Sequence, residues 1–168
     1  MTEPLLAWIN RLRDGVEETA VRLGDRSVLV YEPPEAEDES TLTEYRYRTV
    51  SGVSPTTFGG GEPMVFLLTK TRDNAFQRRV TVGRTSNNDL PIEDPSVSRF
   101  HAWFQREDEE APWFVVDAGS KNGTRLNGKV LEKKKPYALA PGMKIRIGHV
   151  DLSFFDARGF LKMLKTRL

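Results

Sequence analysis

The chain has 168 residues, of which 38% are hydrophobic and 29% are charged, and its formal net charge is +1 at pH 7. This composition suits a soluble globular protein and not a disordered or membrane-spanning one, and the balance of charge disfavours broad binding to nucleic acid. The absence of cysteine excludes disulfides, thiolate zinc sites and a cysteine nucleophile, and it fits a reducing compartment.

The first residues predict an amphipathic helix. Apolar residues recur at spacings of three and four positions, namely Leu5, Trp8, Ile9, Leu12, Val16, Ala20 and Leu23. Thr2 is the candidate N-cap before Pro4, and Gly24 is the candidate end. A helix of this length is marginal alone in water, so its apolar face must pack on something. Packing on its own domain, or on a second copy of the chain in a dimer, is favoured over docking to another protein.

The N-terminus also lacks the features of a targeting segment. Glu3, Asn10 and Arg11 interrupt any secretion signal, and no apolar run approaches the roughly 20 residues that span a bilayer. We therefore expect a cytoplasmic protein that binds neither a membrane nor nucleic acid, and we expect no metal and no cofactor.

Residues 27–61 are expected to hold short strands and linkers. In order, they contain a β-prone run at 27–31, an acidic Pro-bearing stretch at 33–40, a weakly alternating run at 43–50, and a connection rich in Gly, Ser, Thr and Pro from 51 to 62. We therefore divide the chain into an N-terminal extension (1–61), a main domain (62–156) and a C-terminal helix that packs on it (157–168).

From Met64 the pattern changes to short strands separated by turn signals. The candidate strands are residues 64–68, 79–82, 89–92, 100–105, 113–117, 124–126, 129–131, 144–147 and 150–155. Asn127 and Gly128 form a strong hairpin signal, and the acidic run at 107–110 predicts a solvated hairpin tip. Because no helices are interleaved, the main domain is predicted to be an all-β, antiparallel sandwich or barrel.

The last residues predict a helix. Asp156 is its candidate N-cap, and the apolar face would contain Phe160, Leu161, Leu164 and Leu168. Lys162 and Lys165 suit the C-terminal end of the helix dipole.

Three polar clusters lie at the ends of predicted strands, at residues 83–84, 98–101 and 120–123. Loops at one end of a β-sandwich can converge on a ligand although they are far apart in sequence. We therefore predict that the clusters form one ligand-binding surface.

An ordered series of motifs across residues 64–155 resembles the forkhead-associated (FHA) domain. The series comprises Val82-Gly83-Arg84, Asn88-Asp89-Leu90, Asp94, Ser98-Arg99-Phe100-His101, Asp117, Ser120-Lys121-Asn122-Gly123-Thr124, Asn127-Gly128, Pro141-Gly142, Ile145-Arg146-Ile147-Gly148 and Leu152-Ser153-Phe154. The resemblance implies an antiparallel β-sandwich whose loops at one end bind phosphothreonine in a partner protein, without catalysis. Residues 1 to about 60 lie outside it.

Five residues are candidates for phosphopeptide binding. Arg84 can offer a fixed fork of donors to the phosphate, and the Ser98 hydroxyl can donate another hydrogen bond. Arg99 and Lys121 are candidates for further donors. Asn122 carries both a donor and an acceptor, so it can pair with the main chain of the ligand.

Three more residues are expected to support the site. Gly83 would give a tight strand exit, because glycine tolerates positive φ. The resemblance implies that His101 bonds within the loops and holds Ser98 in place. Gly123 would shape its loop. The lysines at 133–135 read as a solvated turn that can strengthen attraction to an acidic partner.

Several alternatives stay open. A hydrolase using Ser98 and His101 is one, although no third orienting acid is evident, and a phosphate-independent scaffold of the same fold is another. The partner can be a kinase, a kinase substrate, or the chain's own N-terminal segment if a kinase modifies it. The candidate threonines there are Thr41, Thr43, Thr56 and Thr57. The oligomeric state is open, since the N-terminal helix could dimerise. Residues 95–97 and 122–125 would set the preference beyond the phosphothreonine.

Overall fold

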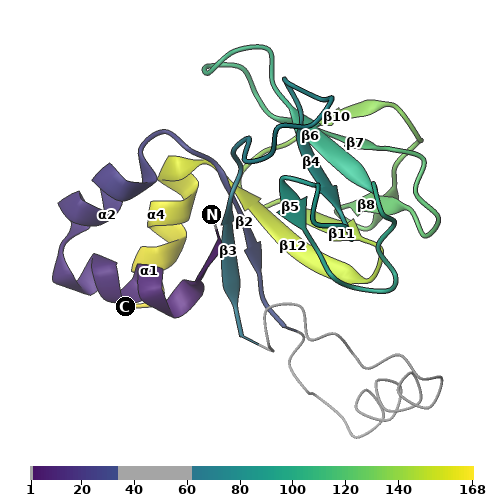
Figure 1. Ribbon diagram of the computed structural model, residues 1–168. Helices are drawn as coiled ribbons and strands as arrows, with labels where there is room; N and C mark the ends of the chain where they lie inside the picture. Colours follow the sequence, from purple (N-terminus) through teal and green to yellow (C-terminus); the bar gives the residue numbers. More distant parts are fainter. Residues whose placement is uncertain (1, 34–61) are drawn as a thin grey trace, which may run out of the picture.

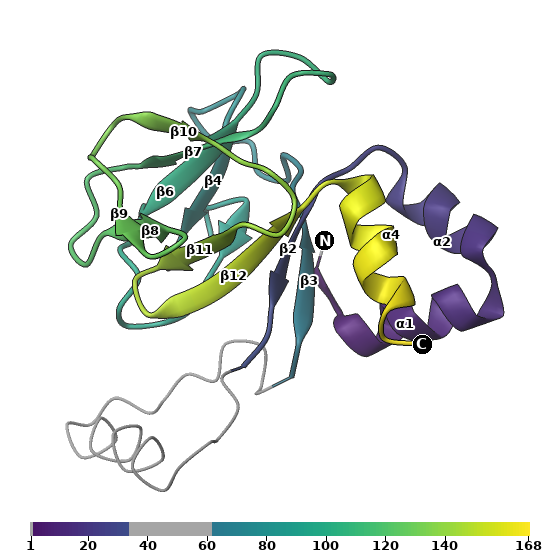
Figure 2. The same cartoon turned by 180° about the vertical axis from the view of Figure 1, so that it is seen from behind.

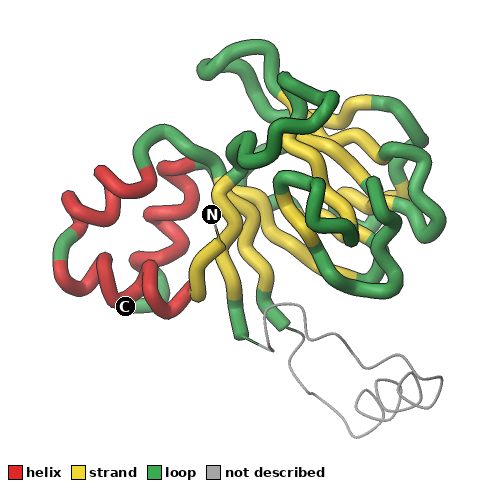
Figure 3. Tube along the Cα trace, in the orientation of Figure 1, coloured by secondary structure: helices red, strands yellow, loops and turns green. Residues whose placement is uncertain are grey.

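The computed structural model describes residues 2–33 and 62–168, which form two β-sheets and three helices (Figures 1 and 3). The seven-stranded sheet consists, in spatial order, of β1 (Thr2–Pro4), β3 (Met64–Leu67), β2 (Val28–Tyr31), β12 (Val150–Phe155), β11 (Lys144–Ile147), β8 (Thr124–Leu126) and β9 (Lys129–Val130). The five-stranded sheet consists of β10 (Pro136–Ala138), β7 (Phe114–Asp117), β6 (Ala102–Gln105), β4 (Val80–Gly83) and β5 (Leu90–Pro91). The helices are α1 (Leu5–Asp14), α2 (Val16–Leu23) and α4 (Ala157–Lys165).

The predicted antiparallel β-sandwich is confirmed. Among the described strands, every pair is antiparallel except β4 and β5. One apolar core lies between the two sheets, with Phe104, Ile145 and Ile147 completely buried. The Asn127-Gly128 turn joins β8 to β9 with both residues at positive φ, 48° and 83°, which is the geometry of the predicted hairpin.

The helices form a third layer on the outer face of the seven-stranded sheet, at its β3–β2–β12 end (Figures 1 and 2). A second apolar core lies between these helices and the sheet. Strand β2 contributes to both cores because its side chains alternate: Leu29 points to the core between the sheets, whereas Val28 and Val30 point to the helices. Trp8 of α1 and Phe160 of α4 meet edge to face, with ring centroids 5.4 Å apart. The apolar face of the N-terminal segment thus packs on its own chain. No helix in the described ranges is both long and apolar enough to cross a membrane.

The N-terminal segment differs from the single predicted helix. Gly15, with φ 174° and ψ 128°, is extended and separates α1 from α2, so the apolar periodicity continues but the helix does not. Val16 is consequently 48% exposed. Thr2 belongs to β1, which pairs with β3, and is therefore not an N-cap. Gly24 ends α2 at φ 57°, as predicted.

The seven-stranded sheet also contains strands from both sides of the boundary that we expected between the N-terminal extension and the main domain at residue 62. Strand β2 lies between β12 and β3, inside the sheet, so part of the expected N-terminal extension is part of the sandwich. At the other end, the Asp156 carboxylate accepts a hydrogen bond from the backbone N–H of Gly159 at 2.6 Å and caps α4, whereas Leu168 lies beyond the helix and is 57% exposed. The weakly alternating run at 43–50, most of the two linkers and the four candidate threonines fall outside the described residues.

Candidate functional site

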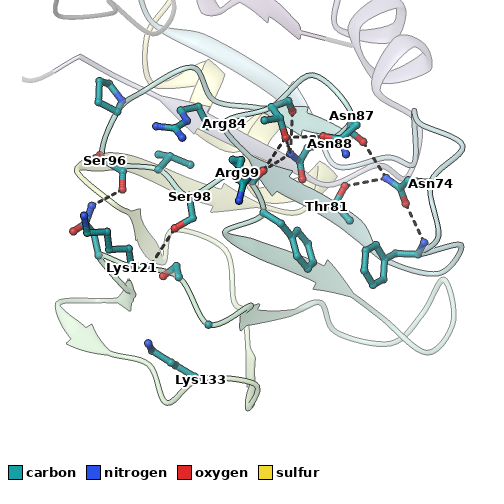
Figure 4. A pocket seen from close by; sticks show the side chains of 18 residues that line it. Asn74, Thr81, Arg84, Asn87, Asn88, Ser96, Ser98, Arg99, Lys121 and Lys133 are labelled. Atoms are coloured by element: carbon teal, nitrogen blue, oxygen red, sulfur yellow. Dashed lines mark hydrogen bonds between the residues drawn. The ribbon is translucent and has the colours of Figure 1, made fainter. Parts of the chain in front are cut away.

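Three loops meet at Ser98 and its neighbour Ser96. The backbone N–H of Arg84, directly after β4, donates to the carbonyl of Ser98 at 2.9 Å. The backbone N–H of Lys121, between β7 and β8, donates to the Ser98 Oγ at 3.0 Å, and the Asn122 side-chain amide donates to the carbonyl of Ser96 at 2.8 Å. The polar clusters that are separated in sequence therefore form one surface (Figure 4).

This surface is hollowed into a pocket of about 1010 Å³. All five predicted ligand-binding residues line it: Arg84, Ser98, Arg99, Lys121 and Asn122. The three predicted supporting residues, Gly83, His101 and Gly123, do not line it. Lys133 adds a fourth cation to the lining, and no carboxylate of the described residues belongs to it. The pocket thus concentrates positive charge in a protein that is nearly neutral overall.

The polar groups of the pocket retain capacity for a ligand. The Arg84 guanidinium is exposed and makes no hydrogen bond or ion pair within residues 2–33 and 62–168. Because the Ser98 Oγ accepts from Lys121, its own hydroxyl proton remains available to donate. Asn122 uses one amide N–H for Ser96, which leaves its second N–H and its carbonyl oxygen for a peptide main chain.

His101 holds two of the loops together. Its Nδ1 accepts the backbone N–H of Ser98 at 3.0 Å, so its Nε2 carries the proton and donates to the carbonyl of Gly123 at 2.9 Å. The ring is fully buried. Burial lowers the pKa of His101 from the usual 6.5, and this effect outweighs the hydrogen bond to Gly123 and the nearby Asp117, which act in the opposite direction. Both ring nitrogens are engaged, so neither can take a proton from the Ser98 hydroxyl.

Mild acid is expected to destabilise the protein through His101. The folded-state pKa lies below 6.5, so between the two pKa values the unfolded chain binds more protons, and the free energy of unfolding falls as pH falls through this window. Urea unfolding between pH 5 and 8 measures the effect. His101→Asn should flatten the profile. A wild-type profile that is flat below pH 6.5 contradicts the assignment.

Gly83 is required for a different reason from the one that the sequence suggested. It is not among the glycines with positive φ. A Cβ at this position would lie 2.2 Å from the carbonyl oxygen of Arg99, so only glycine permits the two loops to approach this closely. Asn88 reinforces the same contact, because its side-chain amide donates to the Arg99 carbonyl at 2.8 Å. Gly123, in contrast, does adopt a positive φ of 81°.

Asp117 organises the loop that carries Lys121 and Asn122. One carboxylate oxygen accepts the backbone N–H groups of Gly119 and Ser120 at 2.8 and 2.9 Å. The other accepts the hydroxyls of Ser120 and Thr124 at 2.6 and 2.7 Å. Burial by itself would raise the pKa of Asp117, but these hydrogen bonds hold the pKa below its usual value. In the sequence, Asp117 stood out only as one member of the motif series, and nothing there showed that it supports the site.

Sequence reasoning also missed part of the lining, including Asn74, Phe76 and Phe100. Lys133 was read as part of a solvated turn. The turn is exposed, but the backbone N–H of Lys134 donates to the carbonyl of Asp117 at 2.8 Å and so places the lysines beside the site. The run of three lysines at 133–135 was the one sequence signal that could have pointed to Lys133 as a site residue. Phe76 lies in an irregular loop in which no sequence pattern marks it.

Comparison with known proteins identifies the family. The sequence model of the FHA domain family matches residues 80–148 of this chain. The glycogen accumulation regulator GarA of Mycobacterium tuberculosis is 32% identical over 145 residues, which is 83% of this chain and 79% of GarA. The FHA domain of yeast Dun1, solved with a doubly phosphorylated peptide derived from Rad53, matches with a TM-score of 0.51 at 24% identity, covering 79% of this chain and 75% of that one. The chain belongs to the family of FHA-domain proteins.

Other relatives share only part of their length with this chain. The human angiogenic factor with G patch and FHA domains 1 is 38% identical over 80 residues, which are 44% of this chain and 11% of that protein. The chain therefore spans about a tenth of the length of this relative.

Proposed function

We propose that this protein is a phosphothreonine-dependent protein-binding module that acts in kinase signalling or regulated assembly. The single observation that carries the proposal is the lining of the pocket, which combines four cations and a serine hydroxyl without any carboxylate of the described residues. A phosphothreonine presents nearly two negative charges and three strong acceptor oxygens at neutral pH. Such a group is expected to bind where unpaired cationic donors converge.

Each residue has a distinct role in the proposed complex. Arg84 makes a fork of charged hydrogen bonds to the phosphate, and the Ser98 hydroxyl adds a further donor. Lys121 and Arg99 neutralise the remaining charge. Asn122 pairs with the main chain of the ligand beside the phosphothreonine. A hydrolase based on Ser98 is not favoured, because both nitrogens of His101 are used within the loops.

The partner is proposed to be a phosphothreonine-containing protein in the cytoplasm, namely a kinase, a kinase substrate, or the N-terminal segment of the chain itself. GarA is named as a regulator, which supports a regulatory setting. Binding to the chain's own segment would require phosphorylation at Thr41, Thr43, Thr56 or Thr57, which lie outside the described residues. An internal ligand on a linker competes at an effective concentration of about a millimolar.

A phosphothreonine peptide library tests the proposal. We expect micromolar dissociation constants for the selected peptides, and loss of binding when the phosphate is removed. Phosphoserine versions should bind more weakly, because the lost methyl is worth about 0.8 kcal/mol by burial, or about fourfold in affinity. Equal binding of the unphosphorylated peptides would overturn the proposal and would favour a phosphate-independent scaffold.

A further inference from the structure

The pocket continues beyond the phosphate-binding residues onto a row of stacked aromatic rings. Phe76 stacks on Phe100 with centroids 5.0 Å apart and planes at 19°, and Phe100 stacks on Trp103 at 6.0 Å and 15°. We call these three residues the aromatic ledge. Phe76 and Phe100 line the same pocket as Ser98 and Arg99. Phe76 is 36% exposed, whereas Trp103 is only 7% exposed, so the ledge offers ring surface to a ligand at its Phe76 end.

The loop that carries Phe76 is held in place although it has no regular secondary structure. The side-chain Oδ1 of Asn74 accepts the backbone N–H of Phe76 at 3.1 Å, and the side-chain Nδ2 of Asn74 donates to the Thr81 Oγ1 at 3.2 Å. Farther back, the buried Asp89 carboxylate accepts the backbone N–H groups of Thr71 and Arg72 at 2.8 and 2.7 Å. The ledge is therefore built into the fold, and a ligand need not order it first.

Asp89 remains ionised throughout the physiological range. Burial by itself would raise its pKa, but the hydrogen bonds from Lys70 and from the backbone N–H groups lower the pKa to about 2. The anchor of the Phe76 loop therefore persists throughout the pH range in which the phosphate of a phosphopeptide is doubly charged.

Two cations lie against the ledge. The Arg79 guanidinium lies 4.4 Å from the centroid of Trp103 and 5.8 Å from that of Phe76, and the Lys134 ammonium lies 5.6 Å from Trp103. Neither cation forms an ion pair with a carboxylate of the described residues. The indole N–H of Trp103 is already used, because it donates to Gln105 at 2.8 Å. This region therefore offers a ligand two features: apolar ring surface, and positive charge that no carboxylate of the described residues neutralises.

The ledge lies to one side of the phosphate-binding centre. Figure 4 shows Ser96 and Lys121 on one side of Ser98, and Asn74 and Thr81 on the other. A peptide that crosses Ser98 has two arms, and an arm that leaves on the side opposite Ser96 runs toward the loop of Asn74, which holds Phe76. The ledge is therefore continuous with the proposed ligand path.

We propose that the aromatic ledge binds the arm of a phosphothreonine peptide that points away from Ser96, and that it selects an aromatic or branched aliphatic residue next to an acidic one. The apolar side chain packs on Phe76 and Phe100, and the acid pairs with Arg79 and Lys134. This inference rests on the proposed function, since it adds a specificity subsite to the same pocket. Aromatic contacts and desolvated charge pairs are typical of the residues that dominate binding energies.

Two matched peptides test the ledge. A phosphothreonine library that is degenerate over five positions on each side supplies the ledge peptide, with the selected apolar and acidic pair, and a second peptide replaces that pair with Gly and Ser. For the wild-type protein we expect the ledge peptide to bind at least about fivefold more tightly. Phe76→Ala and Arg79→Gln should bring this ratio of dissociation constants close to one. Phe76→Tyr should keep the ratio, because it retains the ring.

Val21→Ala is the control, since Val21 is 77% exposed on α2 and is not among the residues that line the pocket. It should retain the wild-type ratio. Phosphate-dependent binding without any preference for an apolar and acidic pair would overturn the proposal that the ledge is a specificity subsite, and it would leave the proposed function standing. A ratio that survives Phe76→Ala also overturns it. Failure of both peptides to bind in a phosphate-dependent manner overturns the proposed function, and the inference with it.

Discussion

Replacing Asp117 with alanine is expected to lower the free energy of unfolding by about 3 kcal/mol or more. The carboxylate accepts four hydrogen bonds in a fully buried position, and each buried donor left without a partner costs about 1–3 kcal/mol. The loop of Lys121 and Asn122 loses its anchor in the same variant, so phosphopeptide affinity should fall as well. Urea unfolding measures the first effect, and peptide titration the second.

Asp108→Ala is a matched control for this variant. Asp108 also accepts two backbone N–H groups, from Glu110 and Ala111 at 2.9 and 2.7 Å, but at the exposed tip of the β6–β7 hairpin. Water can replace it there, so we expect a loss below about 1 kcal/mol. The loss of unfolding free energy for Asp117→Asn should lie between those for Asp117→Ala and Asp108→Ala, because the amide oxygen of asparagine can still accept the backbone donors. Equal losses in Asp117→Ala and Asp108→Ala contradict the role of Asp117.

Arg84→Ala is expected to weaken phosphopeptide binding by about 1.5–3 kcal/mol, or roughly tenfold to 150-fold, without lowering stability. The guanidinium is exposed and bonds to no other residue of the described ranges, so its removal leaves the fold intact. Arg84→Lys should recover only part of the affinity, because lysine keeps the charge but loses the planar fork of donors. Titration with one selected phosphothreonine peptide measures the difference.

The control for charge is Arg158→Ala, since Arg158 is exposed on α4 and does not line the pocket. It should bind the peptide as the wild type does. If Arg158→Ala weakens binding as much as Arg84→Ala, then general electrostatic attraction, and not a specific fork at Arg84, accounts for the affinity.

The sequence predicted the sandwich and the residues that meet at the pocket, because the strand ends and motif spacing carry that information locally. Arg84, Ser98 and Asn122 each follow a recognisable strand or turn, so they could be placed before the structure was known. Their contacts with a ligand remain predictions. The role of His101 was implied by family resemblance, and its two hydrogen bonds give that role a geometric basis.

Features that depend on contacts distant in sequence could not be predicted. The position of Phe76 is set by Asn74 and the buried Asp89, and no periodicity marks that loop. The need for Gly83 comes from the carbonyl of Arg99, which only the fold brings near. The break at Gly15 was missed because the apolar spacing continues through it, while the backbone there is extended.

Strand β2 gives the protein a particular order of assembly. It lies near the start of the chain, yet it pairs with β12 near the end, with Val28 opposite Phe155. During synthesis β2 must wait for β12 to leave the ribosome, and such distant pairings slow folding. Until then the edge of β2 that later pairs with β12 is open to wrong partners. A fragment that starts at residue 80, where the family match begins, would lack β2 and leave β12 with a bare edge, so the unit to express is the longer chain.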